Sequence, residues 1–359
     1  MNTNRIKVLI ADDSTVMRTL LLHLLRADSA LEVVGMVEDG QAALDFVVNA
    51  IERPDVVLMD IHMPRMDGFE ATRRIMEAQA LPIVICTATS DPKEMQVAFR
   101  SMEAGAVACV EKPVSPQHPD FESASRNLLQ TLRLMSEVKV VRRWPRPRAP
   151  VLPFARAPAA PGAMPLIGIG ASTGGPAVLQ TVLAGLSRDF PAPLLIVQHI
   201  SRGFLQGMVE WLNDTVDLTV RIAAHGTLLR PGHAYIAPDD FHLSAGAGAR
   251  AVLTREEPEN GLRPAVSCLF RSLAVSYGPT AIGVLLTGMG KDGAVELKQM
   301  RDRGAFTIAQ DRESSVVHGM PGEAIQLGAA MQVLSADRIA GALIARMRRG
   351  SLSSTEIGV

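Results

Sequence analysis

The chain has few cysteines and no long apolar run. Only three of its 359 residues are cysteine, and Cys86, Cys109 and Cys268 lie far apart without CxxC or CxxxH spacing. This excludes a disulfide framework and a cysteine-based zinc site, and it favours a reducing compartment. No stretch of about 18 uncharged apolar residues occurs, as a membrane-spanning helix would need. The N-terminal sequence reaches the pair Asp12 and Asp13 before any signal-like apolar segment, so we expect a cytoplasmic protein without membrane insertion.

The chain also lacks an excess of charge of either sign. Lysine and arginine total 36 residues against 37 for aspartate and glutamate, which gives a formal net charge of −1 at pH 7. A balanced charge gives no electrostatic reason to expect nucleic-acid binding by the whole chain. Basic residues do gather between Lys139 and Arg148, but prolines interrupt them, and we interpret this stretch as a solvated linker.

A proline-rich segment divides the chain. The segment from Val141 to Pro165 contains seven prolines, Pro165 included, a composition typical of a semi-rigid, partly extended linker. The predicted parts are a first domain over 1–135, a linker over 136–164, a second domain over 165–348 and a disordered tail over 349–359. A length of 359 residues agrees with two or three domains of roughly 150 residues each.

Apolar runs alternate with helical patterns on both sides of the linker. Before it, five such runs predict a five-stranded parallel sheet with helices on both faces. After it, four more buried runs predict a second α/β domain with a doubly wound, mostly parallel sheet. Short strand and turn signals from about Leu218 to Leu253 predict an antiparallel β-hairpin inserted into this second sheet.

Residues that end the strands predicted in the first half carry distinctive chemistry. They are Asp12 and Asp13 after the first strand, Asp60 after the third, Thr87 at the end of the fourth and Lys112 after the fifth. Carboxyl ends of parallel strands meet at one sheet edge. Three carboxylates there repel one another, and a hard cation such as Mg²⁺ would relieve the repulsion. With a lysine and a threonine to contact phosphate oxygens, the set describes a carboxylate that accepts a phosphoryl group.

Residues 5 to about 130 resemble the response-regulator receiver family. The matching segments are VLIADDSTVMR, VLMDIHMPRMDGFEA, ICTATS and VEKP. The resemblance implies a flavodoxin-like (βα)5 fold and phosphorylation of Asp60 by a sensor histidine kinase. It also implies a Mg²⁺ ion at Asp12, Asp13 and Asp60, and a switch formed by Thr87 and Lys112. Many receivers carry an aromatic residue three positions before this lysine, where the present chain has Cys109, so we expect an output without an aromatic switch.

Beyond the linker, the segment PLIGIGASTGGP joins an apolar strand, a glycine-rich turn and the start of a helix. Residues 170–174 fit the pattern G-x-S-x-G, which exposes a serine hydroxyl at a helix N-terminus where N–H groups can stabilise an oxyanion. Ser172 is therefore a candidate nucleophile. On this motif alone, a serine that only caps the helix and a glycine-rich loop that binds a dinucleotide remain alternatives.

Two further strand ends supply partners for Ser172. The next strand ends at His199, and a later strand runs into Asp292, so both residues reach the same sheet edge. A histidine base held by an aspartate completes a Ser-His-Asp triad. A dinucleotide site would instead need an acidic residue at the end of the second strand, where Gln198 and His199 stand.

The chain order serine, histidine, acid differs from the order in α/β-hydrolases. That order would require Asp239 or Asp240 together with His318. We judge this alternative weaker, because the two aspartates lie in the turn-rich hairpin region and His318 lies in a polar loop. A receiver joined to a non-catalytic binding module is the second class of function that we consider.

Residues from about 165 to 347 resemble the chemotaxis protein-glutamate methylesterase family, CheB. The matching segments, in chain order, are GIGASTGGP, VQHI, YIAPDDFHL, LLTGMGKDGA and QDRESSVVHGMP. The resemblance implies hydrolysis of glutamate methyl esters on chemoreceptors with release of methanol, often with deamidation of receptor glutamines. The implied roles are Ser172 as nucleophile, His199 as base, Asp292 as orienting acid, the Met289 N–H as oxyanion donor and Thr173 as a pocket residue. No cofactor is expected for this half.

The segment ENGLRPAVSCLF departs from the pattern of many relatives. Leu262, Ala265 and the pair Ser267-Cys268 stand where those relatives carry a histidine, a serine and an Asp-Val pair. We expect this region to contact the substrate and to affect the choice of receptor rather than the chemistry.

Overall fold

The computed structural model describes residues 5–87, 92–138, 140 and 164–352. The chain divides into two compact units, Met1–Arg146 and Pro147–Val359, which are described separately. The expected linker falls almost entirely on residues outside the described part. Within the described ranges, no helix is both long enough and apolar enough to cross a bilayer.

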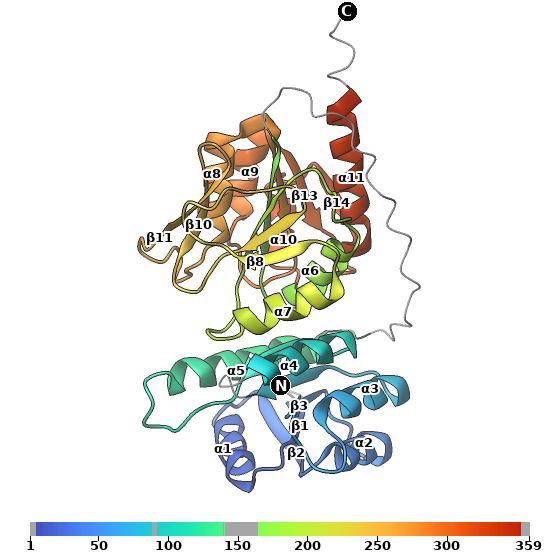
Figure 1. Ribbon diagram of the computed structural model, residues 1–359. Coiled ribbons are helices and arrows are strands. Elements are labelled where there is room, and N and C mark those ends of the chain that lie inside the picture. The colour runs from blue at the N-terminus through green and yellow to red at the C-terminus, as the bar shows by residue number, and fades with distance from the viewer. Residues whose placement is uncertain (1–4, 88–91, 139, 141–163, 353–359) are drawn as a thin grey trace, which may run out of the picture. The chain divides into compact units, whose positions relative to one another are not determined.

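The first unit, coloured from blue to blue-green in Figure 1, is built on a five-stranded parallel sheet, and its strand order is β2-β1-β3-β4-β5. The strands are β1 (Ile6–Ala11), β2 (Leu31–Val37), β3 (Val56–Met59), β4 (Ile83–Thr87) and β5 (Ala108–Glu111). The helices are α1 (Thr15–Arg26), α2 (Gly40–Asn49), α3 (Gly68–Ala78), α4 (Pro92–Glu103) and α5 (Phe121–Ser136). The predicted (βα)5 order is confirmed. The strand order reverses beside β1, and ligands of such sheets bind at the carboxyl edge of that point.

The loop after β3 is held close to the start of α3. The Gly68 N–H donates to the Ile61 carbonyl over 2.8 Å, and a Cβ at Gly68 would lie 2.0 Å from the carbonyl oxygen of Asp60. Only glycine fits so close to a neighbouring backbone. Asp67 caps α3 by accepting from the Glu70 N–H over 2.8 Å. These contacts fix the backbone around Asp60.

The second unit contains a seven-stranded sheet with the order β14-β13-β12-β6-β7-β9-β8. The strands are β6 (Leu166–Ala171), β7 (Leu194–Gln198), β8 (Thr219–Ile222), β9 (His233–Ile236), β12 (Ala281–Leu285), β13 (Phe306–Gln310) and β14 (Gln332–Leu334). Every pair of adjacent strands is parallel. The carboxyl ends of β6, β7 and β12 therefore lie at one edge, next to one another.

Helices cover both faces of this sheet. They are α6 (Gly175–Ala184), α7 (Leu205–Thr215), α8 (Val266–Ser276), α9 (Ala294–Asp302), α10 (Met320–Gln326) and α11 (Ala336–Leu352), with a short 3₁₀ turn at Gly278–Thr280. One face carries α6 between α7 and α11, and the other carries α9 between α8 and α10. Leu269, Phe270 and Leu273 of α8 are fully buried in the core. The start of α8 is thereby anchored beside the carboxyl edge of the sheet.

The predicted hairpin is present but does not interrupt the parallel sheet. Strands β10 (His242–Gly246) and β11 (Arg250–Thr254) pair antiparallel in a separate two-stranded sheet. Strands β8 and β9, also in the expected hairpin region, instead join the edge of the large sheet in parallel. At the C-terminus, α11 continues to Leu352, past the start of the expected tail at residue 349. Residues 353–359 of that tail lie outside the described part.

Candidate functional site

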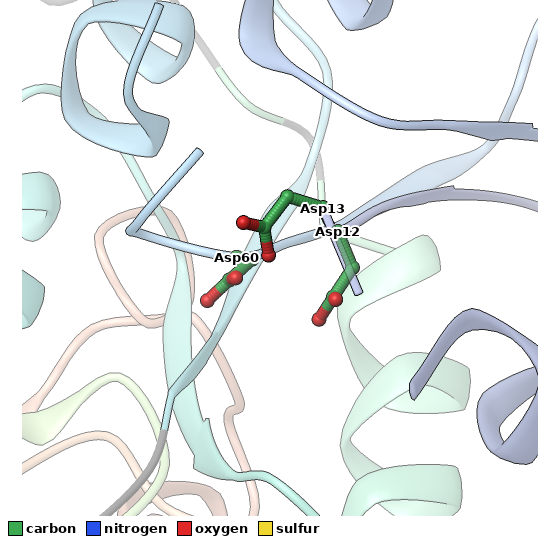
Figure 2. A group of neighbouring side chains, drawn as sticks. All are labelled: Asp12, Asp13 and Asp60. Atoms are coloured by element: carbon green, nitrogen blue, oxygen red, sulfur yellow. The ribbon is translucent and has the colours of Figure 1, made fainter. Parts of the chain in front are cut away.

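Three aspartates meet at the carboxyl edge of the first sheet (Figure 2). Asp12 and Asp13 follow β1 and Asp60 follows β3, and one carboxylate oxygen of each lies within 4.8 Å of the others. Asp12 and Asp60 are buried, whereas Asp13 is exposed. Oxygen donors at this spacing are what a hard divalent cation such as Mg²⁺ takes as ligands. The donor set fits the expected ion.

Lys112 neutralises part of this negative charge. Its Nζ lies 2.9 Å from Oδ2 of Asp12 and 2.8 Å from Oδ2 of Asp60. Burial raises the pKa of Asp60, and the bond and charge of Lys112 oppose that rise. Burial alone would lower the pKa of Lys112, but its bonds to Asp60 and Asp12 raise it above the ordinary value. The bonds between Lys112 and the two aspartates favour the charged forms of all three groups and oppose the effect of burial on each.

Thr87 and Cys109 are placed by β4 and β5, the two strands that follow β3 in the sheet. Thr87 is buried at the end of β4, and its carbonyl oxygen accepts from the Lys112 N–H over 2.9 Å. Residues 88–91, which follow it, lie outside the described part. Cys109 in β5 pairs with Ile85 of β4 and is half-buried. The carboxyl ends of β1, β3, β4 and β5 thus bring four side chains to one edge of the first sheet, those of Asp12, Asp60, Thr87 and Lys112.

In the second unit, Ser172 lies in a tight turn between β6 and α6. Its N–H donates to the Thr287 carbonyl over 3.0 Å, and its own carbonyl accepts from the Gly175 N–H over 2.8 Å. A Cβ at Gly288 would lie 2.7 Å from the Cβ of Ser172, so the loop after β12 packs directly on this turn. Gly174, two residues after Ser172, has a φ of 75°, in the left-handed region. The turn leaves Ser172 half-buried at the helix N-terminus.

His199 follows the neighbouring strand. The register pairs Ala171 of β6 with Gln198 of β7, and the His199 N–H donates to the Ala171 carbonyl over 3.0 Å. Ser172 and His199 therefore each come directly after the last residue of their strand, side by side at the carboxyl edge of the sheet. The buried amide of Gln198 joins them further, because its Nε2 donates to the carbonyls of Ser172 (2.8 Å) and His199 (2.7 Å). From the sequence, Gln198 served only as an argument against a dinucleotide site.

Asp292 is buried in the loop between β12 and α9, and its Oδ2 lies 3.0 Å from Nε2 of His199. Burial acts to raise the pKa of Asp292, but bonds from His199 and Ser267 outweigh it and hold that pKa below its ordinary value. The carboxylate is kept ionised beside the imidazole.

The remaining predicted pocket residues lie in the same loops. Met289 is exposed, with 44% of its surface accessible, immediately after Gly288. The Thr173 carbonyl accepts from the Thr287 hydroxyl over 3.0 Å. Thr287 itself is held by the buried Gln310, whose side-chain oxygen accepts from the Thr287 N–H over 2.7 Å.

The residues of the α/β-hydrolase alternative are not brought together. Asp239 accepts from the Gly203 N–H over 3.3 Å, and Asp240 pairs with Arg202. His318 lies in the loop after β13, with its Nδ1 3.3 Å from the Ser315 hydroxyl. In the sheet, β9 and β13 are separated by β7, β6 and β12. This geometry gives His318 no contact with either aspartate.

Ser267 has a role that the sequence did not indicate. It is only 4% exposed, and its hydroxyl lies 2.6 Å from Oδ1 of Asp292. Contact of the segment ENGLRPAVSCLF with the substrate stays a prediction. Cys268 is half-buried, and burial raises the pKa of its thiol to about 12 with a further contribution from Glu259. Ser267 therefore belongs to the surroundings of Asp292.

Two family models match separate parts of the chain. The sequence model of the CheB methylesterase family matches residues 167–343, and that of the response regulator receiver domain matches residues 8–119. Protein-glutamate methylesterase/protein-glutamine glutaminase 4 of Geobacter metallireducens is 54% identical over 341 residues, which is 94% of this chain and 98% of the relative. The corresponding protein of Nitrosospira multiformis is 48% identical over 342 residues, 94% of this chain and 96% of the relative.

A solved structure resembles the second unit. The CheB methylesterase catalytic domain of Thermotoga maritima is 40% identical to this chain and superposes with a TM-score of 0.50, covering 51% of this chain and 99% of that domain. Relatives of this identity that extend over nearly the whole chain show common descent of both units together. The chain therefore belongs to the CheB methylesterase family and carries a response regulator receiver domain in its first half.

Proposed function

We propose that this chain is a phosphorylation-regulated protein-glutamate methylesterase that acts in the cytoplasm on methylated chemoreceptors. The observation that carries the proposal is the arrangement of Ser172, His199 and Asp292 after three adjacent parallel strands, with His199 and Asp292 3.0 Å apart. The names of the full-length relatives support the same substrate class. The second class considered above, a non-catalytic binding module, would have no need for an ionised, buried aspartate next to a histidine.

The reaction begins with proton transfer from Ser172 to His199. Because Nε2 of His199 lies toward Asp292, Nδ1 is the ring nitrogen that accepts this proton. The serine oxygen attacks the ester carbonyl, and backbone N–H groups at the start of α6 and at Met289 stabilise the oxyanion. The tetrahedral intermediate collapses, the bond to the methoxy oxygen breaks, and methanol leaves with the proton from His199.

Water completes the cycle. His199 removes a proton from water, the hydroxide attacks the acyl-enzyme, and Ser172 leaves with the proton from His199. The product is the free glutamate side chain. A glutamine substrate follows the same path and releases ammonia in place of methanol, so the chain also serves as a protein-glutamine glutaminase, as the relatives are named.

The receiver site accepts a phosphoryl group from a sensor histidine kinase. An Asp60 oxygen attacks phosphorus, the bond between phosphorus and the histidine nitrogen breaks, and an acyl phosphate forms. Asp12, Asp13 and Asp60 would hold Mg²⁺, which when bound offsets the charge of the phosphoryl oxygens. Lys112, already 2.8 Å from Asp60, pairs with a phosphoryl oxygen, and the Thr87 hydroxyl bonds another.

Release of methanol by the full-length chain tests the enzymatic part. With a methylated receptor as substrate, Ser172→Ala should abolish release, whereas Ser187→Ala should leave it unchanged. Ser187 is a matched control because it lies in the loop between α6 and β7, at the opposite edge of the sheet. Near-normal release by Ser172→Ala would exclude Ser172 as nucleophile.

A further inference from the structure

The carboxylate of Asp292 is clamped by the N-terminus of α8. The Val266 N–H donates to Oδ2 over 2.6 Å and the Ser267 N–H donates to Oδ1 over 3.0 Å. The N-cap of this helix, Ala265, has no side chain that could bond these N–H groups, so Asp292 caps α8 from a distant part of the sequence. The clamp fixes the position of the carboxylate group.

A side chain completes the clamp. The Ser267 hydroxyl lies 2.6 Å from Oδ1 of Asp292, and its oxygen accepts from the Gly293 N–H over 3.1 Å. With two donors on Oδ1 and the Val266 N–H on Oδ2, the plane of the carboxylate is set, and Oδ2 faces His199. Ser267 and Asp292 are only 4% and 5% exposed, so water does not compete for these bonds.

The same hydroxyl has a second carboxylate next to it. Oε2 of Glu296 lies 2.8 Å from the Ser267 oxygen, and Glu296 is 9% exposed. Arg271 holds Glu296 in place by donating to its other oxygen, Oε1, over 3.3 Å, while N–H groups of Arg271 also bind Glu259. A hydroxyl has one hydrogen, so Ser267 can donate to only one of the two carboxylates at a time.

We propose that Ser267 is a positioning residue for the esterase reaction, whose hydroxyl orients Asp292 toward His199, and that Glu296 competes with Asp292 for this hydroxyl. This inference rests on the proposed roles of His199 and Asp292. The N-terminus of α8 thus helps to orient the base His199 through Asp292. Glu296 lowers the activity, because it draws the Ser267 hydroxyl away from Asp292.

The first test separates the hydroxyl from the volume of the side chain. Threonine and valine are nearly equal in size, but only threonine carries a hydroxyl, so Ser267→Thr and Ser267→Val share any cost of overpacking. On the full-length chain with a methylated receptor, we expect Ser267→Val and Ser267→Ala to lower kcat about tenfold with KM little changed, because a small misplacement of catalytic groups reduces rate rather than binding. Ser267→Thr should retain most of the parental kcat.

Exposed Ser276 at the other end of α8 provides the control, and Ser276→Ala should leave both parameters unchanged. Equal kcat values for Ser267→Thr and Ser267→Val, or a parental kcat for Ser267→Ala, would overturn the proposal. Those results would leave the esterase assignment intact if Ser172→Ala is inactive in the same assay, so the two failures can be told apart.

The second test concerns Glu296. In Glu296→Gln, the amide oxygen takes the position of Oε1 because Arg271 donates there, and the amide N–H₂ then faces Ser267. The amide donates to the Ser267 oxygen, which leaves the hydroxyl hydrogen for Asp292 alone. We expect kcat to rise about twofold, because in the parent the hydroxyl would donate to Glu296 instead of Asp292 about half of the time. In the double variant with Ser267→Ala, Glu296→Gln should not raise kcat. A kcat at or below the parental value for Glu296→Gln would contradict the competition.

Discussion

Asp292 is buried yet ionised, because hydrogen-bond donors surround its carboxylate. Its pKa lies below the ordinary value, since these bonds outweigh the effect of burial. A carboxyl group whose pKa is lower in the folded than in the unfolded chain stabilises the fold above the unfolded pKa of about 3.9. This stabilisation disappears as the pH falls through the folded pKa.

We therefore predict that Asp292→Asn lowers the free energy of unfolding of the second domain at pH 7, and that the difference from the parent narrows below about pH 4. Urea denaturation followed by fluorescence of Trp211, which is buried in α7, measures this between pH 3 and 7. Exposed Asp189 supplies the control, because Asp189→Asn should change stability little at any of these pH values. The free energies of unfolding of Asp292→Asn and the parent could instead differ by the same amount at every pH from 3 to 7. That result would argue against an ionised Asp292 that stabilises the fold.

Asp60 is the residue expected to carry the phosphoryl group. Its Oδ2 is paired with Lys112, and Oδ1 accepts from the Ile61 N–H over 2.8 Å. We predict that acetyl phosphate labels the full-length chain in the presence of Mg²⁺, and that either Asp60→Asn or EDTA prevents labelling, because the carboxylate and the cation are both required. Intact-mass spectrometry detects the added phosphoryl group. Labelling that survives the substitution would place the acceptor elsewhere, and Asp67→Asn, which alters only the cap of α3, is the matched control.

The strand ends were predictable from the sequence, since a buried parallel strand is a continuous apolar run and its last residue marks the carboxyl edge. Ser172, His199 and Asp292 were identified in this way, and the structure places them after β6, β7 and β12. Strand β14 was not recognised, and β8 was expected only within an antiparallel hairpin rather than as a parallel strand of the large sheet. Both lie at an edge of the sheet and are largely exposed or mixed in burial, so they lack the apolar run that indicates a buried strand.

The contacts that support the site could not be read from the sequence. Ser267 lies 25 residues before Asp292, and Glu296, four residues after Asp292, contacts Ser267 rather than Asp292. Ser267 reaches both carboxylates because α8 packs beside α9. For Gln198, the sequence predicted only that it ends a strand. Its bonds to the carbonyls of Ser172 and His199 depend on the register between β6 and β7. Tertiary packing, rather than local pattern, determines such contacts.

The close approach of the β12 loop to the nucleophile turn leads to a prediction about glycine. In Gly288→Ala, the new methyl would lie 2.7 Å from the Ser172 Cβ and 2.3 Å from the Met320 sulfur. We expect a loss of about 1–3 kcal/mol in the free energy of unfolding, as is typical of overpacking, together with a lower kcat because Ser172 is displaced. Thermal unfolding and release of methanol measure both effects.

Gly341 in α11 gives the opposite expectation. It is exposed, and nothing lies within 4 Å of the position of an added Cβ. Gly341→Ala should raise the free energy of unfolding by about 0.5–1 kcal/mol through helix propensity and leave kcat unchanged. Similar effects of both substitutions on kcat would contradict the specific contact between Gly288 and Ser172.

The two units of the chain are joined covalently, and this has consequences for regulation. Two domains linked on one chain have effective concentrations for each other up to the millimolar range. Even a weak interaction between them would therefore hold a large fraction of the molecules in the associated state. Phosphorylation of Asp60 changes the charge at an edge that includes Thr87 and Lys112, and it can alter such a contact. We propose that the unphosphorylated receiver restricts access of the receptor to Ser172.

A shortened chain that begins at Pro150 should therefore release methanol faster than the intact, unphosphorylated chain, and phosphorylation of the intact chain should narrow the difference. Initial rates on one methylated receptor compare the three proteins, with Asp60→Asn as the control that cannot respond to the phosphodonor. If the shortened chain is no faster than the intact one, the receiver does not inhibit by blocking access, and activation or localisation becomes the better explanation.

In the proposed reaction, Ser172 forms a covalent acyl-enzyme with a receptor glutamate. A short reaction of the intact chain with a methylated receptor peptide, stopped with acid and analysed by mass spectrometry, tests this claim directly. We predict an adduct whose mass is that of the chain plus the peptide minus methanol, located on Ser172 and absent in Ser172→Ala. An adduct on another residue, or one that persists in Ser172→Ala, would contradict it.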